Sequence, residues 1–332
     1  MTVRVVHGRS RLLLPVVAQS RSGRFGELLT FRDAKSSIME WTSISALEAR
    51  IEFDESANNG LVLTNKYLPE ELLSEILFRV DLKAMLNCQL VCKRWYSILH
   101  TYVWRKKAEA ILGQRLHFDG EFSWLLYYVI CNNNSIGKNL LKNHSGRSGT
   151  NKFWRILSNG GHRWKVECPP AGAPKLPSSE PVFENEQFCF VTSFGHCNKE
   201  QTVDLVSEGF PPRFLDQFQP PIVISEWYSS RWDCPAAYKC SAVLKTECDL
   251  VLKTFHFENI LDGETQNTWF QVQHEFTNYG PGVRKVTFTH GGIDQKFWAG
   301  HYGSKMAGAC IKVNLPKQMP TESEEVTYMV VD

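Results

Sequence analysis

The sequence has no long apolar run and no excess of charge of one sign. In 332 residues no stretch approaches the roughly 18 apolar residues that span a bilayer, and the apolar run nearest the N-terminus is broken by Pro15. Lys and Arg number 37 against 35 Asp and Glu, a net charge of +2. This balance provides no global field for nucleic acid or anionic lipid. We therefore expect no membrane insertion and no nucleic-acid partner.

The sequence also lacks the cysteine and histidine spacings that are typical of zinc sites and disulfide scaffolds. The sequence contains no CxxC or HxxxH pair, and its 10 cysteines form no dense framework of short spacings. Cys88 and Cys92 lie four residues apart in a helical pattern, where we interpret them as small packed hydrophobes. We expect a reduced, cytoplasmic protein with no metal and no cofactor.

Composition divides the chain into five stretches. Residues 1–60 lack sustained periodicity, which predicts a disordered arm. Residues 66–112 have helical periodicity, and 113–135 are expected to form a linker helix or connection. Residues 136–316 have the texture of β-strands, and 317–332 form a polar, acidic tail. The fold class predicted is α+β multidomain, a small three-helix module followed by an antiparallel β-sandwich.

The helical module begins at Leu68-Pro69-Glu70-Glu71. Proline suits a first helical turn because its missing N–H would be unpaired there anyway, and the two glutamates complement the helix dipole. Asp81 is a candidate N-cap for a second helix. Because a module of ~40 residues cannot bury every helix face, some apolar side chains should remain available to a partner.

The second half alternates aromatic and β-branched residues with polar ones, between Gly, Pro and Asn turns. Eight or more short strands without interleaved helices predict the antiparallel sandwich. The segments predicted as strands are Val182-Phe183, Phe188 to Thr192, Thr202 to Val206, Ile222 to Trp227, Tyr238 to Leu244, Trp269 to Phe276, Val283 to Thr289 and Ala309 to Val313.

Residues Leu68-Pro69-Glu70-Glu71, Val91-Cys92-Lys93-Arg94-Trp95 and Trp104 together resemble an F-box. The resemblance implies a three-helix module that docks on the Skp-type adaptor of cullin-RING ubiquitin ligases. Leu68 and Pro69 carry over as adaptor-binding residues. Trp95 is expected in the core, because large aromatics at helical spacing are more often core than interface. For Trp104 the sequence does not decide between the core and the interface.

A longer resemblance runs through six blocks of the strand-rich part. They resemble the F-box-associated domain of the sugar-recognising F-box only subfamily, a jelly-roll-like β-sandwich. The family implies binding of the inner chitobiose of high-mannose N-glycans on glycoproteins returned to the cytosol. The blocks are Asn139-Leu140-Leu141-Lys142-Asn143, Phe153-Trp154, Gly160-Gly161-x-x-Trp164-x-Val166, Trp227-Tyr228-Ser229-x-Arg231, Tyr279-Gly280-Pro281-Gly282-Val283-Arg284 and His290-Gly291-Gly292-x-Asp294…Trp298-x-Gly300.

The resemblance places glycan-binding roles on four residues. Phe194 matches an apolar wall, Asp233 a carboxylate that accepts hydrogen bonds from a sugar, and Phe297 with Trp298 an aromatic pair on which N-acetylglucosamine packs. These types suit a pyranose, whose C–H face packs on an aromatic ring and whose polar rim needs acceptors and donors. From the residues alone, Phe194 is equally a core aromatic, and the alternative for Asp233 is to cap a turn. The alternative for Trp298 is a place in the sandwich core, but the polar residues just before it and Gly300 after it predict an exposed loop position.

The second loop departs from the family pattern. The family's sugar binders have Tyr-Trp-Lys where this chain has Phe297-Trp298-Ala299, and each lost hydrogen bond weakens binding by roughly 0.5–1.5 kcal/mol. The leading hypothesis is a non-catalytic receptor of an SCF-type ligase that binds N-glycosylated misfolded proteins for ubiquitination and ER-associated degradation. The alternative is an F-box receptor that recognises clients without the glycan.

A third hypothesis is a carbohydrate-active enzyme. Glycoside hydrolysis usually needs two positioned carboxylates. The sequence offers Asp233 and Asp294, but no local signature pairs them. We therefore expect no catalytic residues.

Overall fold

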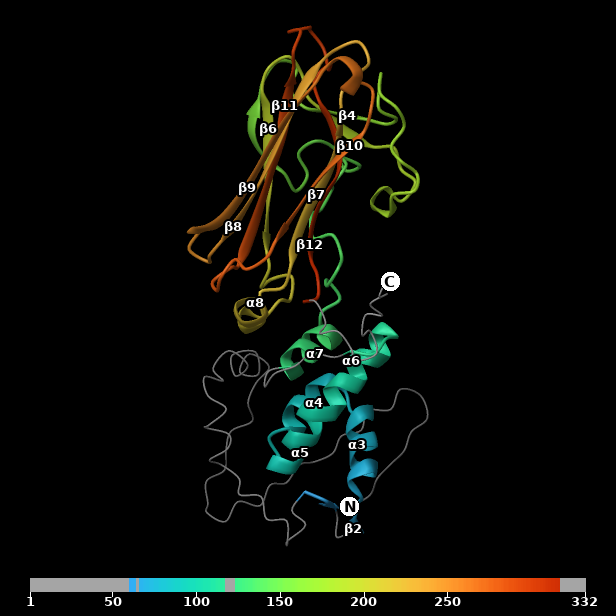
Figure 1. The fold of residues 1–332 in the computed structure, drawn as a ribbon, viewed down its shortest axis with the longest axis vertical. Helices are drawn as coiled ribbons and strands as arrows, with labels where there is room; N and C mark the ends of the chain where they lie inside the picture. Colours follow the sequence, from blue (N-terminus) through green and yellow to red (C-terminus); the bar gives the residue numbers. More distant parts are fainter. Residues whose placement is uncertain (1–59, 64–65, 117–122, 317–332) are drawn as a thin grey trace, which may run out of the picture. The chain divides into compact units, whose positions relative to one another are not determined.

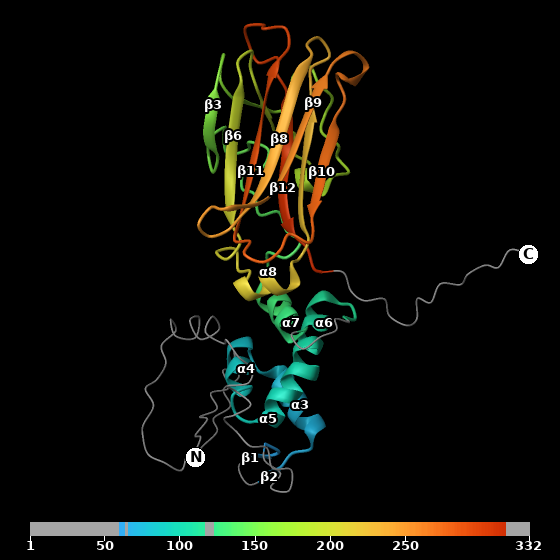
Figure 2. The ribbon, with the colours of Figure 1, turned by 60° about the vertical axis from the view of Figure 1, so that its left-hand side comes forward.

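The computed structural model describes residues 60–63, 66–116 and 123–316 (Figures 1 and 2). It divides into two compact units, with the boundary in the chain between Lys106 and Lys107. The predicted arm, apart from Gly60, and the predicted tail lie outside the described residues. The fold class predicted from the sequence, a helical module followed by an antiparallel sandwich, is confirmed.

The first unit is helical. Glu70 and Glu71 form the first turn of its first helix, directly after Pro69. The Asp81 carboxylate caps the next helix, accepting from the backbone N–H groups of Lys83 and Ala84 at 3.1 and 3.0 Å. The third helical stretch is continuous through a π-helical turn. The elements are β1 (Val62–Leu63), β2 (Lys66–Tyr67), α3 (Glu70–Arg79), α4 (Leu82–Cys88), α5 (Lys93–Ile98), η1 (Leu99–Val103) and α6 (Trp104–Leu112), the last crossing into the second unit.

The two tryptophans of this helical stretch are buried. Trp95 is buried as expected, and its indole Nε1 donates to the Gly60 carbonyl at 2.6 Å. Trp104 is fully buried, so it is not part of an exposed interface. Cys88 and Cys92 are buried thiols, which confirms that they pack as small hydrophobes. All 10 cysteines fall in described residues and are free thiols.

Within its described residues the second unit holds two five-stranded sheets, ordered β3-β6-β11-β8-β9 and β10-β7-β12-β5-β4. All neighbouring strands are antiparallel. Along β8 every second residue is buried, as expected of a strand with one face on a core. The strands are β3 (Arg155–Asn159), β4 (Lys165–Glu167), β5 (Cys189–Val191), β6 (Cys197–Asp204), β7 (Ile222–Ser229), β8 (Ala236–Lys245), β9 (Val251–Leu261), β10 (Phe270–Phe276), β11 (Lys285–Asp294) and β12 (Lys305–Val313).

Two sequence-based predictions for this unit are wrong. Val182-Phe183 is not a strand but part of a 3-10 turn, η2 (Pro181–Phe183), because Pro181 starts the turn without needing an N–H partner. The sandwich also contains an interleaved helix, α8 (Pro212–Phe218), which begins after Pro211 and buries Phe214 and Leu215. Outside the two sheets lie α7 (Ser123–Asn132), within the predicted connection, and a second 3-10 turn, η3 (Gly263–Thr265).

Strand register brings five loops to one end of the sandwich. The end of β11 pairs with the starts of β6 and β8, at Gly292↔Cys197 and Asp294↔Ala236. The start of β12, Lys305, pairs with the last residues of β5 and β7. The end of β9 and the start of β10 lie at the same level, at Leu261↔Ala236 and Phe270↔Tyr228. The β3–β4, β5–β6, β7–β8, β9–β10 and β11–β12 connections therefore emerge together, at the end opposite α8 (Figure 2).

Candidate glycan-binding loops and adaptor face

Backbone hydrogen bonds join three of these loops. The Asp294 N–H donates to the Ser193 carbonyl at 3.1 Å, and the Gln295 N–H donates to the Pro235 carbonyl at 2.9 Å. The Ser193 hydroxyl also donates to the Gly300 carbonyl at 2.6 Å. The β11–β12 loop is thus fixed against the loops that carry Phe194 and Asp233.

The β11–β12 loop presents two aromatic side chains to solvent. Its first turn is closed by the buried carboxylate of Asp294, whose Oδ1 accepts the backbone N–H groups of Lys296 and Phe297. Phe297 has a left-handed backbone with φ +54°. The side chain of Phe297 is 75% exposed and that of Trp298 is 43% exposed. The exposure expected for Trp298 from its polar neighbours is confirmed.

Phe194 lies in the loop cluster rather than in the sandwich core. It is half-buried, and its ring meets the Phe297 ring edge-on with centroids 5.1 Å apart. On another side it contacts the His162 ring at 5.2 Å, from the β3–β4 loop. Phe194 and Phe297 therefore form one apolar corner of the loop end.

Trp298 is connected to Asp233 by two intervening side chains. Its indole meets the Tyr302 ring edge-on at 5.5 Å, and the Arg231 guanidinium lies over that ring at 4.6 Å. Arg231 then binds Asp233 through Nε and Nη2, each 2.8 Å from a carboxylate oxygen. The structure thus brings all four predicted glycan-binding residues to one end of the sandwich.

The Asp233 carboxylate is held in its ionised form. Hydrogen bonds from Arg231 lower its pKa below the ordinary value. An acid catalyst of glycoside hydrolysis needs the opposite shift, a raised pKa. Asp294 has its Oδ1 committed to backbone N–H groups of the loop. The backbone contacts of Asp294 brace its loop, and the lowered pKa of Asp233 does not suit an acid catalyst.

Sequence reasoning missed several residues at this end. Tyr302 and Arg231 link the predicted residues, and Arg231 was already part of a matched block without an assigned role. His301 lies beside His162, with ring centroids 6.2 Å apart and His301 Nε2 3.2 Å from the His162 carbonyl oxygen. Burial lowers the pKa of His301. The exposed Trp232, between Arg231 and Asp233, also carried no assignment.

In the helical unit the predicted adaptor-binding residues lie at the start of α3. Pro69 is exposed, while Leu68 is half-buried and its N–H donates to the Leu61 carbonyl at 2.8 Å. Leu72 and Ile76, which the prediction did not include, are 54% and 41% exposed. Their spacing from Pro69 places all three on one side of the helix. The helical periodicity of the apolar residues places Leu72 and Ile76 on the helix, but it cannot distinguish an exposed apolar side from a buried one.

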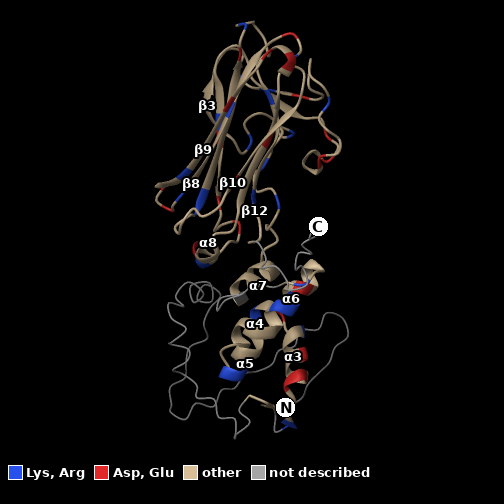
Figure 3. Cartoon of the chain, in the orientation of Figure 1, with Lys and Arg blue, Asp and Glu red and all other residues tan. Residues whose placement is uncertain are grey.

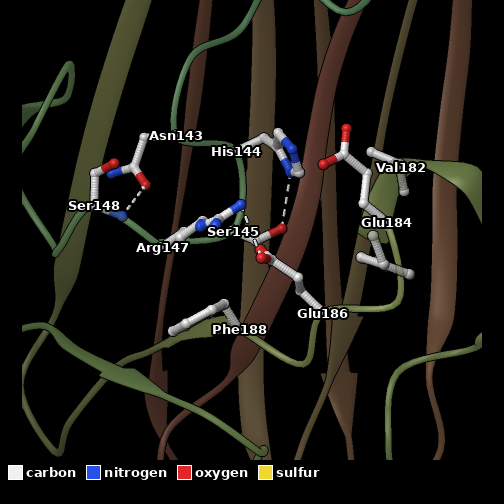
Figure 4. A pocket seen from close by; sticks show the side chains of 10 residues that line it. Asn143, His144, Ser145, Arg147, Ser148, Val182, Glu184, Glu186 and Phe188 are labelled. Atoms are coloured by element: carbon white, nitrogen blue, oxygen red, sulfur yellow. Dashed lines mark hydrogen bonds and ion pairs between the residues drawn. The ribbon is translucent and has the colours of Figure 1, made fainter.

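A small cavity of about 140 Å³ lies elsewhere in the sandwich unit, between residues 143–148 and 182–188 (Figure 4). Arg147 and Glu186, which line it, form an ion pair with Nη1 2.8 Å from Oε1. His144 Nδ1 lies 2.8 Å from the Ser145 hydroxyl, and burial lowers the pKa of this histidine. No predicted site residue lines this cavity.

In residues 60–63, 66–116 and 123–316, no three His, Cys, Asp or Glu side chains are grouped to hold a metal ion. No helix in the same part of the chain is long and apolar enough to cross a membrane.

Comparison with known families identifies both units. The F-box-like family model matches residues 66–109, and the model of the F-box associated region matches residues 131–313. Rat F-box only protein 6 is 34% identical over 252 residues, which cover 74% of this chain and 86% of the relative. The chain belongs to the F-box only proteins with an F-box associated region. The resemblance drawn from the sequence blocks is therefore confirmed.

Other members of the family match over similar lengths. Human F-box only protein 44 is 33% identical over 257 residues, covering 75% of this chain and 96% of the relative. Among solved structures, the carbohydrate-binding module TmCBM61 in complex with β-1,4-galactotriose aligns with 54% of this chain and 100% of its own, at 12% identity and a TM-score of 0.32.

Proposed function

We propose that this F-box protein is the substrate-recognition subunit of an SCF-type cullin-RING ubiquitin ligase in the cytoplasm. Its F-box, residues 66–112, binds a Skp-type adaptor. Residues 113–135 connect it to the F-box-associated sandwich, residues 136–316. The sandwich binds the chitobiose core of high-mannose N-glycans on misfolded proteins, for ubiquitination and ER-associated degradation.

The observation that carries the glycan proposal is the exposed Phe297–Trp298 pair beside the Asp233 loop. An exposed indole offers a flat apolar surface for the C–H face of a pyranose. Asp233 remains ionised, so its oxygens accept charge-assisted hydrogen bonds from sugar hydroxyl or amide groups. Phe194 closes the apolar corner against Phe297.

In this proposal the chain performs no bond-making chemistry itself. One unit holds the ligase and the other holds the client. Tethering two binding modules on one chain raises the effective concentration of client lysines near the ubiquitin-charged enzyme. For the adaptor, the exposed side of α3 at Pro69, Leu72 and Ile76 supplies an apolar contact surface.

A second candidate function is glycan-independent client recognition. It is favoured by Phe297 and Ala299, which bring no hydroxyl or amine to the loop, and by Arg231, which already occupies both oxygens of Asp233. In that case the exposed aromatic pair would contact apolar segments of a misfolded polypeptide.

The test is capture of a high-mannose glycoprotein by the full chain, in native and denatured form, against the same glycoprotein after enzymatic deglycosylation. The proposal predicts capture that is lost on deglycosylation and is competed by free chitobiose. Equal capture of both forms, without competition, would replace it with the glycan-independent alternative.

Separate variants test which unit binds the glycoprotein and which binds the adaptor. Trp298→Ala should lose glycoprotein capture and keep the adaptor, whereas Leu68→Ala with Pro69→Ala should lose the adaptor and keep the glycoprotein. If the Trp298 variant still captures the glycoprotein fully, the assigned loop is not the binding site.

A further inference from the structure

Trp232 lies at the tip of the turn that joins β7 to β8 and is 66% exposed. The turn is closed by a backbone bridge between Arg231 and Cys234. Both sequence neighbours of Trp232 belong to the loop end described above, because Arg231 covers Tyr302 and pairs with Asp233. A large aromatic side chain is thus exposed in the loop that carries Arg231 and Asp233, at the same end of the sandwich as the candidate glycan site.

The backbone of Trp232 is held on two sides. Its N–H donates to the Gly172 carbonyl at 2.9 Å. The Gln266 side-chain amide donates to the carbonyls of Arg231 and Trp232 at 2.9 and 3.3 Å. A Cβ atom at Gly172 would lie 2.8 Å from the Arg231 guanidinium carbon, so the two loops approach closely. A pre-ordered turn presents its indole with little further loss of conformational entropy on binding.

Contacts are continuous from Trp298 toward this turn. Tyr302 contacts Trp298, Arg231 lies over Tyr302, and Trp232 follows Arg231 in the chain. The charges of Arg231 and Asp233 compensate each other. Acidic and basic residues are also interspersed over the sandwich as a whole (Figure 3). An aromatic surface with a charge-compensated polar rim suits a neutral, hydroxyl-rich ligand.

We propose that Trp232 is a second aromatic contact for the same glycan, packing on the sugar that follows the chitobiose disaccharide. This inference rests on the proposed glycan-binding function. The ligand of the loop end is then an oligosaccharide longer than two sugars. Phe297 and Trp298 bind the disaccharide, and Trp232 binds the mannose attached to its non-reducing end.

The experiment is a calorimetric titration of the full chain with two probes. One probe is chitobiose, and the other is chitobiose extended by mannose at its non-reducing end. The wild-type chain is expected to bind the extended probe about tenfold more tightly, the scale of one aromatic contact. Trp232→Ala should bring this ratio close to one, and Trp232→Phe should restore part of it. Leu250→Ala, an equally exposed apolar residue in the β8–β9 connection at the other end of the sandwich, should leave the ratio unchanged.

The outcomes separate this inference from the proposed function. If the wild-type chain binds neither probe, the glycan proposal itself fails. If it binds both and the ratio survives Trp232→Ala, the glycan proposal stands and the role of Trp232 is overturned. A third probe, chitobiose linked to an asparagine-containing peptide, tests for a polypeptide contact. If Trp232→Ala weakens binding of that probe alone, Trp232 contacts the polypeptide and the inference is again overturned.

Discussion

Arg231 holds both carboxylate oxygens of Asp233, with Nε 2.8 Å from Oδ1 and Nη2 2.8 Å from Oδ2. The same guanidinium covers the Tyr302 ring, on whose edge Trp298 packs. The ion pair thus orients a hydrogen-bond acceptor and supports the aromatic platform together. A bound sugar must use the lone pairs of Asp233 that Arg231 leaves free.

Asp233→Asn should weaken glycan binding about tenfold, because it removes a charge-assisted acceptor and loosens Arg231 over Tyr302. Titration calorimetry with chitobiose at pH 7 measures the change. Asp249→Asn is the matched control, since Asp249 forms an exposed ion pair with Lys285 in the connection at the other end of the sandwich. Unchanged affinity in the Asp233 variant would show that this carboxylate only braces its turn.

Leu72→Glu should abolish co-purification of the Skp-type adaptor without lowering the thermal stability of the chain. Leu72 is 54% exposed on the side of α3 that also carries Pro69 and Ile76, so a charge there costs little in the free protein. In a complex it would be buried without a partner. Glu71→Ala, on another side of the same helix, is the control. If the adaptor still binds the Leu72 variant, this side of α3 is not its docking surface.

Asp216→Asn should lower the free energy of unfolding by about 1–3 kcal/mol at pH 7. Asp216 of α8 accepts from Arg284 at 2.8 and 2.7 Å and from the Gly282 N–H at 2.7 Å, which fastens the helix to the segment just before β11. Hydrogen bonds from Arg284 lower the Asp216 pKa. Its contribution is therefore present above the unfolded-state pKa of about 3.9 and is lost as the pH falls through the lower folded-state value.

Denaturant unfolding at pH 7, 5 and 3 measures this Asp216 difference. The gap between wild type and variant should be equal at pH 7 and 5 and smaller at pH 3. A gap that does not change with pH would mean that the helix anchor does not depend on the ionised carboxylate.

Glu226→Leu should destabilise the sandwich by about 3–5 kcal/mol, because it leaves buried polar partners without their acceptor. Glu226 is fully buried in β7, with one oxygen 2.6 Å from the Tyr238 hydroxyl and the other 2.6 Å from His290 Nδ1. Burial lowers the pKa of His290.

Lys199→Met is the informative contrast to Glu226→Leu. Burial lowers the Lys199 pKa well below its ordinary value, and its Nζ is surrounded by the rings of Phe190, Trp164 and Trp154. Methionine fills similar space without a charge, so this variant should cost less than Glu226→Leu. Equal losses in the two variants, measured by chemical denaturation, would show that Lys199 is as necessary to the core as Glu226.

Buried polar residues of this kind explain why the sequence-based prediction of one strand, β6, began too late. Alternation located β7, β8 and β10 because their inward positions are largely apolar. β6 was predicted to start at Thr202, but it starts at Cys197. Lys199 and Gln201 occupy inward positions of that strand, so a polar residue stands where the pattern requires an apolar one.

The candidate site was only partly predictable for a different reason. The resemblance supplied Phe194, Asp233, Phe297 and Trp298, of which the last three lie in or next to a matched block. The contact of Arg231 with Tyr302 joins loops that are 71 positions apart in the chain (231 to 302), and no local spacing predicts it. Trp232 fits no period, so only its exposure in the folded turn reveals it.

The central claim is that the exposed indole of Trp298 packs on an N-acetylglucosamine. The most direct measurement is a calorimetric titration of chitobiose into the full wild-type chain and into its Trp298→Ala variant. We predict saturable one-to-one binding to the wild type, and at least a tenfold weaker affinity in a variant with unchanged thermal stability. Equal affinity in the two proteins, or no binding to a folded wild-type chain, would contradict the account.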